Sequence, residues 1–249
     1  MAKSGEKTYF KKIGEQEVAH SLLKPFSYTE TIGSLLHDIA AVFSLLPKDR
    51  HPLKILDLGC GTGWTSVFLS KAGHQVTGVD ISPDAKKAAK KHFAFEPNMP
   101  NFICSDYDSL PYENEIDAVV FFDSLHHSID ELDGLSAAYK SLKSGGTIIL
   151  CEPGYRHSKH EQSLKAVRDY GVNERDMPPK LSKKALKQTG FKNIKVYAYP
   201  AMVHRALYND SQQGLTKYLR SNFLVRAITV GLISSVLLPL HGIVTAKKP

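Results

Sequence analysis

The chain has 249 residues, of which 42% are hydrophobic, and this composition can build a core that needs no disulfide bonds or structural metal ions for stability. Its three cysteines, Cys60, Cys104 and Cys151, stand singly, which argues against a disulfide framework or a zinc site. The formal net charge is +7, but the lysines are spread along the chain as on a solvated surface, so nucleic acid is disfavoured as a partner. Residues 1–17 lack the apolar segment of a secretory signal, and the cytoplasm is the expected location.

The expected elements begin with a helical region at residues 15–46, which we interpret as one or two helices. Short apolar runs then predict strands at 53–58, 75–80, 101–105, 117–122, 146–152, 192–199 and 242–247. Helix-length segments separate the first five runs, and this alternation indicates a parallel sheet covered on both faces. The sequence therefore predicts an α/β fold with one sheet.

Four regions are expected along the chain. They are an N-terminal helical lid at 1–50, a core at 51–200, an apolar helical cap insertion at 201–241, and the last core strand with a tail at 242–249. Residues 227–246 are uncharged, which suggests a membrane-spanning helix. Pro239, His241 and two glycines interrupt this segment, so we reject a membrane span. An apolar helix around 223–238 would instead cap a pocket or rest on a membrane surface.

The segment from Lys54 to Trp64, "KILDLGCGTGW", predicts a passage from a strand through a tight glycine turn into a helix. The free N–H groups and positive dipole of a helix start suit a carboxylate or phosphate. The next strand ends at Asp80, where an acid commonly accepts hydrogen bonds from ribose hydroxyls. A dinucleotide site would need a third glycine three positions beyond Gly61, and Trp64 stands there, so NAD is disfavoured.

The spacing Asp57-x-Gly59-x-Gly61-x-Gly63 resembles motif I of the class I S-adenosylmethionine (SAM)-dependent methyltransferases of the UbiE/COQ5-like, or methyltransferase type 11, kind. Four later segments resemble further parts of that family in the same order: "VTGVDISPDA", "NFICSDYDSLPY", "IDAVVFFDSLHH" and "LKSGGTIILCEPG". The resemblance covers residues 53–153. It implies a Rossmann-like, seven-stranded and mostly parallel sheet, with SAM as cofactor and S-adenosylhomocysteine as product.

The same resemblance implies cofactor contacts for Asp57, Gly59, Cys60, Gly61, Gly63, Asp80, Ile81, Asp106 and Tyr107. Asp57 would accept from the SAM ammonium, or it ties down only its own turn. Asp80 would hold the ribose. Ile81 would flank the adenine, or it belongs to the core. Asp106 would accept from the adenine amine, or it caps a strand end.

Two adjacent histidines, His126 and His127, follow the fourth strand at the edge where ligands bind, and either could take a proton from a hydroxyl acceptor. The resemblance places the second histidine nearer the sulfonium, which favours His127; the alternative is a packing role. Asp123 and Glu152 are weaker candidates. No metal is expected, because the histidines in "HSKHE", 157–161, lack the i, i+4 pairing of a helical metal site.

The function expected from this resemblance is methyl transfer from SAM to a small-molecule acceptor, with O-methylation favoured over N or C. The apolar helix around 223–238 favours an apolar or lipid-linked acceptor. The alternatives are a non-catalytic SAM-binding regulatory or assembly protein, and an rRNA or protein methyltransferase. Residues 122–125, "FDSL", lack the Pro-Pro-aromatic motif of adenine-amine methyltransferases, which argues against that class. Peripheral membrane contact is expected through 213–238, and the oligomeric state stays open.

Acceptor selection is expected in the variable regions, namely the N-terminal helices, 153–180 and 201–241. Four aromatic residues near the N-terminus either close over the site as a lid or belong to an ordinary helix core: Tyr9, Phe10, Phe26 and Tyr28.

Overall fold

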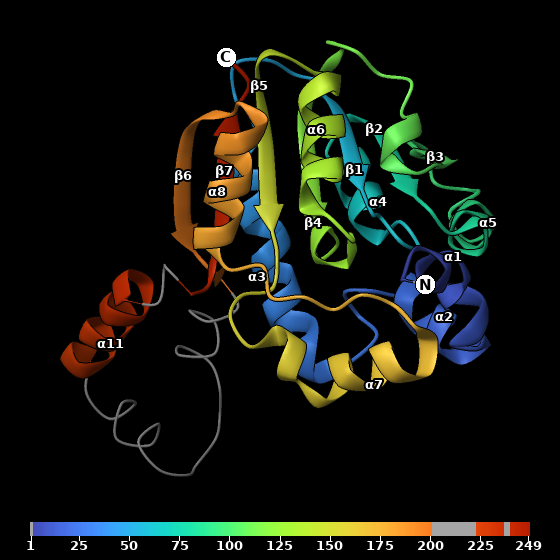
Figure 1. Cartoon of the computed structure of the whole chain (residues 1–249), viewed down its shortest axis with the longest axis horizontal. Helices are drawn as coiled ribbons and strands as arrows, with labels where there is room; N and C mark the ends of the chain where they lie inside the picture. Colours follow the sequence, from blue (N-terminus) through green and yellow to red (C-terminus); the bar gives the residue numbers. More distant parts are fainter. Residues whose placement is uncertain (1, 201–222, 237–239) are drawn as a thin grey trace.

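The computed structural model describes residues 2–200, 223–236 and 240–249 (Figure 1). Three helices come first: α1 (Ala2–Lys12), α2 (Glu15–Leu22) and α3 (Thr29–Leu45). The last two lie within the predicted helical region at 15–46, whereas α1 lies in the expected lid at 1–50 but was not predicted as a separate helix. Its sequence, "AKSGEKTYFKK", contains a glycine and few apolar residues, so it carries no strong helical periodicity.

One seven-stranded sheet forms the centre of the molecule, as predicted. Its strands are β1 (Lys54–Leu58), β2 (Gln75–Asp80), β3 (Asn101–Cys104), β4 (Ile116–Phe122), β5 (Leu142–Cys151), β6 (Lys192–Ala198) and β7 (Gly242–Lys247). The spatial order is β3-β2-β1-β4-β5-β7-β6. In this spatial order, neighbouring strands from β3 through β2, β1 and β4 to β5 pair in parallel, and β7 pairs antiparallel with both β5 and β6. The fold is therefore Rossmann-like, and the carboxyl ends of the parallel strands meet at one edge.

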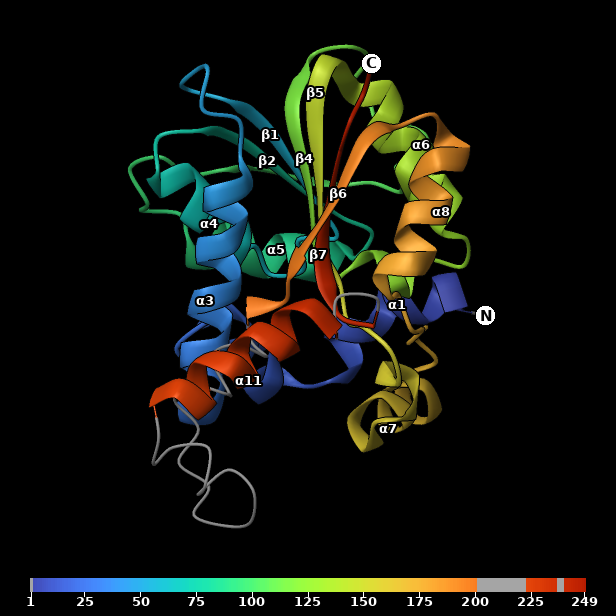
Figure 2. The same cartoon turned by 90° about the vertical axis from the view of Figure 1, so that its left-hand side faces the viewer.

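Helices cover both faces of this sheet, with α3 and α4 on one side and α6 and α8 on the other (Figure 2). The remaining elements are α4 (Trp64–Lys71), α5 (Pro83–His92), α6 (Glu131–Ser141), α7 (Glu161–Tyr170), α8 (Pro179–Thr189) and α11 (Phe223–Val236), with short 3-10 turns η1 (Tyr107–Ser109), η2 (Leu125–His127) and η3 (His157–Lys159). The predicted start of α5 is confirmed: Ser82 caps it, its hydroxyl accepting from the Ala85 N–H at 3.3 Å, and Pro83 is its first residue.

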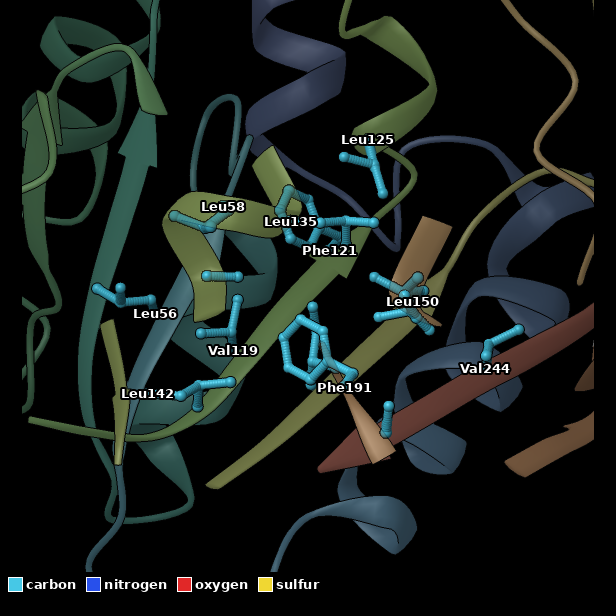
Figure 3. Packing of buried hydrophobic residues seen from close by; sticks show 14 of the residues in the cluster. Leu56, Leu58, Val119, Phe121, Leu125, Leu135, Leu142, Leu150, Phe191 and Val244 are labelled. Carbon is cyan, nitrogen blue, oxygen red and sulfur yellow. The ribbon is translucent and has the colours of Figure 1, made fainter. Parts of the chain in front are cut away.

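The two faces of the sheet build two apolar clusters because alternate strand residues point to opposite sides. Leu56 and Leu58 of β1 face α6 and α8, while Ile55 faces α3 and α4. Figure 3 shows the first cluster, in which Phe121 and Leu135 are fully buried. Truncating such a buried leucine to alanine costs about 2–5 kcal/mol of stability, so these clusters fix the strand ends that carry the site.

Helix α11 confirms the apolar helix expected around 223–238, within the part of the chain that is described. No helix among the described residues is both long enough and apolar enough to cross a bilayer. Residues 201–222 and 237–239 of the predicted cap insertion lie outside the described ranges.

Candidate functional site

The glycine turn between β1 and α4 has the backbone conformation that the sequence predicts. Gly63 sits just before α4 with φ at 87°, in the left-handed region, and a Cβ on it would lie 2.4 Å from the Phe102 ring. No side chain caps the start of α4. The first N–H groups of this helix, which have no intrahelical partner, are therefore available to an anionic ligand group such as a carboxylate.

Asp80, at the end of β2, binds the glycine turn directly. Its Oδ2 accepts from the Gly61 N–H at 2.8 Å and its Oδ1 accepts from the Ser82 N–H at 2.8 Å. Burial raises the pKa of Asp80 above its usual value. A carboxylate has about four lone-pair positions, so two positions are left for ribose hydroxyls. Its ribose role stays a prediction, but its role in shaping the turn is clear.

Asp57, in β1, is buried, with 1% of its surface exposed. Its Oδ2 accepts from the Thr65 hydroxyl at 2.5 Å and from the Ser66 hydroxyl at 2.6 Å. Burial raises its pKa to about 6. These contacts match the alternative in which Asp57 ties down its own turn, and contact with the SAM ammonium stays a prediction. Neighbouring Cys60 is buried too, which raises the pKa of its thiol.

The residues expected at the adenine end follow β2 and β3. Asp106 caps η1, accepting from the Tyr107 N–H at 2.8 Å, and its other oxygen pairs with Lys3 of α1. Ile81 is half-buried after β2. The ring of Tyr107 packs edge-on against Phe121 with centroids 5.9 Å apart. Asp106 thus has a capping role here, and its adenine role stays a prediction.

Helix α1 runs along this region and makes contacts that the sequence did not indicate. Besides Lys3 on Asp106, its Glu6 accepts from the Asn173 N–H at 2.8 Å. The Phe10 ring lies 3.3 Å from where a Cβ on Gly61 would stand. Burial raises the pKa of Glu6 to about 7. Tyr9 and Phe10 therefore belong to a helix that covers the glycine turn, whereas Phe26 is exposed.

The two predicted histidines form η2, directly after β4. The Ser124 hydroxyl donates to the Leu58 carbonyl at 2.7 Å, which fastens this turn beside the start of the glycine turn. His126 is buried and donates from Nδ1 to Glu152 Oε2 at 2.8 Å. His127 is half-buried and donates from Nδ1 to the Asn173 carbonyl at 2.6 Å. In a neutral His127 ring the free lone pair is therefore on Nε2.

Glu174 joins this cluster from the loop after α7. Its Oε2 accepts from His157 Nε2 at 2.6 Å and lies 3.6 Å from His126 Nε2, while its Oε1 lies 3.9 Å from His127 Nδ1. Burial opposes its ionisation, but the contacts with His126 and His157 outweigh burial and hold its pKa below the usual range. The sequence reasoning missed Glu174 and Asn173, because the segment between α7 and α8 has no periodic pattern.

Two polar side chains beside the histidines have donors without a partner among the described residues. Arg175 donates from Nη1 to Glu131 at 3.0 Å, but its buried Nε and Nη2 make no hydrogen bond, and neither does the buried Ser128 hydroxyl. Such groups call for a partner from outside the protein chain, such as an ordered water or a ligand.

His126, His127 and Glu174 offer nitrogen and oxygen atoms within 4.8 Å of one another, a spacing that a metal ion could use. One contact favours a proton network instead. The His127 nitrogen nearest Glu174 is the one that donates to the Asn173 carbonyl, so in this arrangement it has no lone pair for a metal.

Residues 56–150 match the family model described as "Methyltransferase domain". This chain carries a class I SAM-dependent methyltransferase domain. SAM is the cofactor of the domain, and the glycine turn with its uncapped helix start fits the carboxylate end of that molecule. The chain is 35% identical over 96 residues to a ubiquinone biosynthesis O-methyltransferase of Hydrogenovibrio crunogenus, covering 38% of this chain and 40% of the relative. The matched part spans less than half the length of such curated relatives.

Two solved structures resemble the methyltransferase domain and its surroundings. Phosphoethanolamine N-methyltransferase 2 of Haemonchus contortus, in complex with SAM, aligns with a TM-score of 0.60 at 20% identity over 85% of this chain and 52% of that one. The [4+2]-cyclase SpnF aligns with a TM-score of 0.62 at 17% identity over 100% and 97% of the two chains. These similarities show the fold alone, because one fold hosts different reactions.

Proposed function

We propose that this chain transfers a methyl group from SAM to a hydroxyl oxygen of a small-molecule acceptor. The observation that supports this most is the setting of His127. A backbone carbonyl holds its Nδ1–H, which leaves Nε2 as a proton acceptor, and the turn that carries it is fastened beside the glycine turn.

The chemistry follows from the cofactor and this histidine. SAM supplies an electrophilic methyl group, so the protein must align the acceptor and exclude water. A hydroxyl must also lose its proton. Burial, together with the neighbouring His126, lowers the pKa of His127, so its ring is neutral and able to accept a proton near pH 7.

An apolar or lipid-linked acceptor is the second part of the proposal. Leu224, Ile228 and Leu232 of α11 are 67%, 61% and 55% exposed. Their spacing of four residues places them on one face of the helix. We propose that this face rests on a membrane surface or covers an apolar tail of the acceptor, with the protein otherwise in the cytoplasm. The name of the relative from Hydrogenovibrio crunogenus, a ubiquinone biosynthesis O-methyltransferase, agrees with an acceptor of this kind.

The test has two stages. Calorimetry should show micromolar binding of SAM and S-adenosylhomocysteine and no binding of NAD. Purified protein with methyl-labelled SAM is then offered matched acceptors: a prenylated catechol, the same catechol without the prenyl chain, and a prenylated aniline. Mass spectrometry should find the label on the prenylated catechol first. Labelled aniline alone would refute O-methylation, and SAM binding without transfer to any acceptor in extracts of a deletion strain would favour a regulatory or assembly role.

A further inference from the structure

Glu152, directly after β5, is held by an unusual number of donors for a side chain with 2% of its surface exposed. Its Oε1 accepts from the N–H groups of Ser124 and Leu125 at 3.1 and 2.9 Å. Its Oε2 accepts from the N–H group of His126 at 3.2 Å and from the His126 ring at 2.8 Å. A carboxylate that accepts from four donors has no lone pair to spare for a substrate.

His126 therefore lies between two carboxylates, Glu152 on one ring nitrogen and Glu174 on the other at 3.6 Å. Burial disfavours a charged ring, but these two contacts outweigh burial and raise the pKa of His126 to about 10. Its ring lies against that of His127, with centroids 4.1 Å apart. A charged ring at this distance opposes a second charge on its neighbour.

We propose that Glu152 is a positioning residue for the base assigned to His127: it holds a charged His126 ring against His127, so that His127 keeps a bare Nε2. This inference rests on the proposed function. Glu152 itself does not contact the acceptor and acts only through His126. Glu152 also fixes the backbone of the turn that joins β4 to the two histidines. One carboxylate thus sets both the orientation of the histidines and the charge on His126.

Other charged groups face His127 from the elements around it. Among the described residues, Glu6 of α1 lies 3.6 Å from its Nδ1 and Glu174 lies 3.9 Å from it. Of the groups around the ring, Glu174, Asp123 and the bond to the Asn173 carbonyl favour a charged His127. His157 contacts Glu174 and the His126 ring. The charged His126 ring acts in the opposite direction and favours a neutral His127. Loss of the charge on His126 should therefore be visible in the titration of His127.

Glu152→Gln is the sharpest variant, because it leaves the acids around His127 in place. A glutamine can still accept from Ser124 and Leu125, but its NH₂ group faces the His126 ring and favours a neutral ring. The pKa of His127 should then rise by about one to two units. Glu161→Gln, which removes an exposed carboxylate at the start of α7, is the matched control and should leave His127 unchanged.

The experiment is a pH titration of the full chain with ¹⁵N-labelled histidine, read by nuclear magnetic resonance. In the natural protein His126 should stay doubly protonated at pH 8, while His127 is neutral with its proton on Nδ1. A neutral His126 at pH 7, or an unshifted His127 in folded Glu152→Gln, would overturn the proposal. If Glu152→Gln does not fold, the spectrum of the natural protein decides alone.

Two further measurements on the same sample test for a metal site and for the proposed function. Stoichiometric zinc in the purified protein, with histidine signals that change on dialysis against a chelator, would overturn the proposal in favour of a metal site on His126, His127 and Glu174. Calorimetry with SAM tests the proposed function independently. If SAM fails to bind while the histidine titration is as expected, the proposed function is wrong and the arrangement of the two rings still holds.

Discussion

Replacing Asp80 with alanine removes a carboxylate that serves the fold and, by our proposal, the cofactor. The Gly61 and Ser82 N–H groups would each lose a 2.8 Å hydrogen bond. Leaving such groups unpaired costs about 1–3 kcal/mol each, so urea unfolding should show a loss of roughly 2–6 kcal/mol. If the ribose also donates to Asp80, SAM affinity should fall by at least about tenfold, since each charge-assisted bond contributes about 1.5–3 kcal/mol.

Comparing two ligands separates these effects. Adenosine contains the ribose, whereas S-methylmethionine contains only the sulfonium amino-acid end. Calorimetry on Asp80→Ala should show a larger loss for adenosine, and a loosened turn alone would weaken both ligands equally. Asp84→Asn, in the first turn of α5, is the control and should leave both affinities within about twofold. Normal SAM binding together with an unchanged unfolding midpoint would refute both roles given to Asp80.

Three other predictions follow from the described contacts. His127→Ala should lower turnover by about 10²–10⁴ with SAM affinity nearly unchanged, as measured by steady-state kinetics and calorimetry; a parallel loss of SAM affinity would place this ring in the cofactor pocket instead. Burial opposes ionisation of Asp117, but Lys143 at 2.8 Å and other donors outweigh burial and lower the pKa of this carboxyl. The stability that the ionised Asp117 contributes should therefore be present above about pH 4 and be lost as the pH falls. Asp117→Asn should remove that part of the pH dependence of urea unfolding, and an unchanged pH dependence would contradict the prediction. Serine at Leu224, Ile228 and Leu232 together should abolish sedimentation with vesicles of phosphatidylcholine and phosphatidylglycerol, and equal sedimentation of both forms would exclude α11 as the contact.

Most strands could be predicted from the sequence because each is a short apolar run bounded by turn residues, and burial on both faces requires such runs. The exception is β6, whose residues alternate between exposed and half-buried. The β5 strand begins at Leu142, earlier than predicted, because "KSGG" at 143–146 contains no apolar residue to reveal it. The seven strands, the glycine turn and the capped start of α5 all depend on residues close together in the sequence, so local patterns were sufficient.

In the histidine site, local sequence patterns predict only some of the residues. His126 and His127 could be singled out because they follow a predicted strand. Glu174 and Glu6 could not, since their partners are distant in the sequence: the bond from Asn173 to Glu6 spans 167 positions. The order of importance also changed, because Glu152 was a weak candidate by position and becomes central once four donors are seen around one carboxylate.

Helix α1 contacts Asp106 through Lys3, the glycine turn through Phe10 and the segment before Glu174 through Glu6. These three points extend from the expected adenine end to the histidines. Such a helix would have to lift before S-adenosylhomocysteine departs, so we expect its opening to contribute to the turnover rate alongside methyl transfer. Turnover would then slow in viscous buffers, and a chain that lacks residues 1–12 would release product faster while it protects the reaction from water less well.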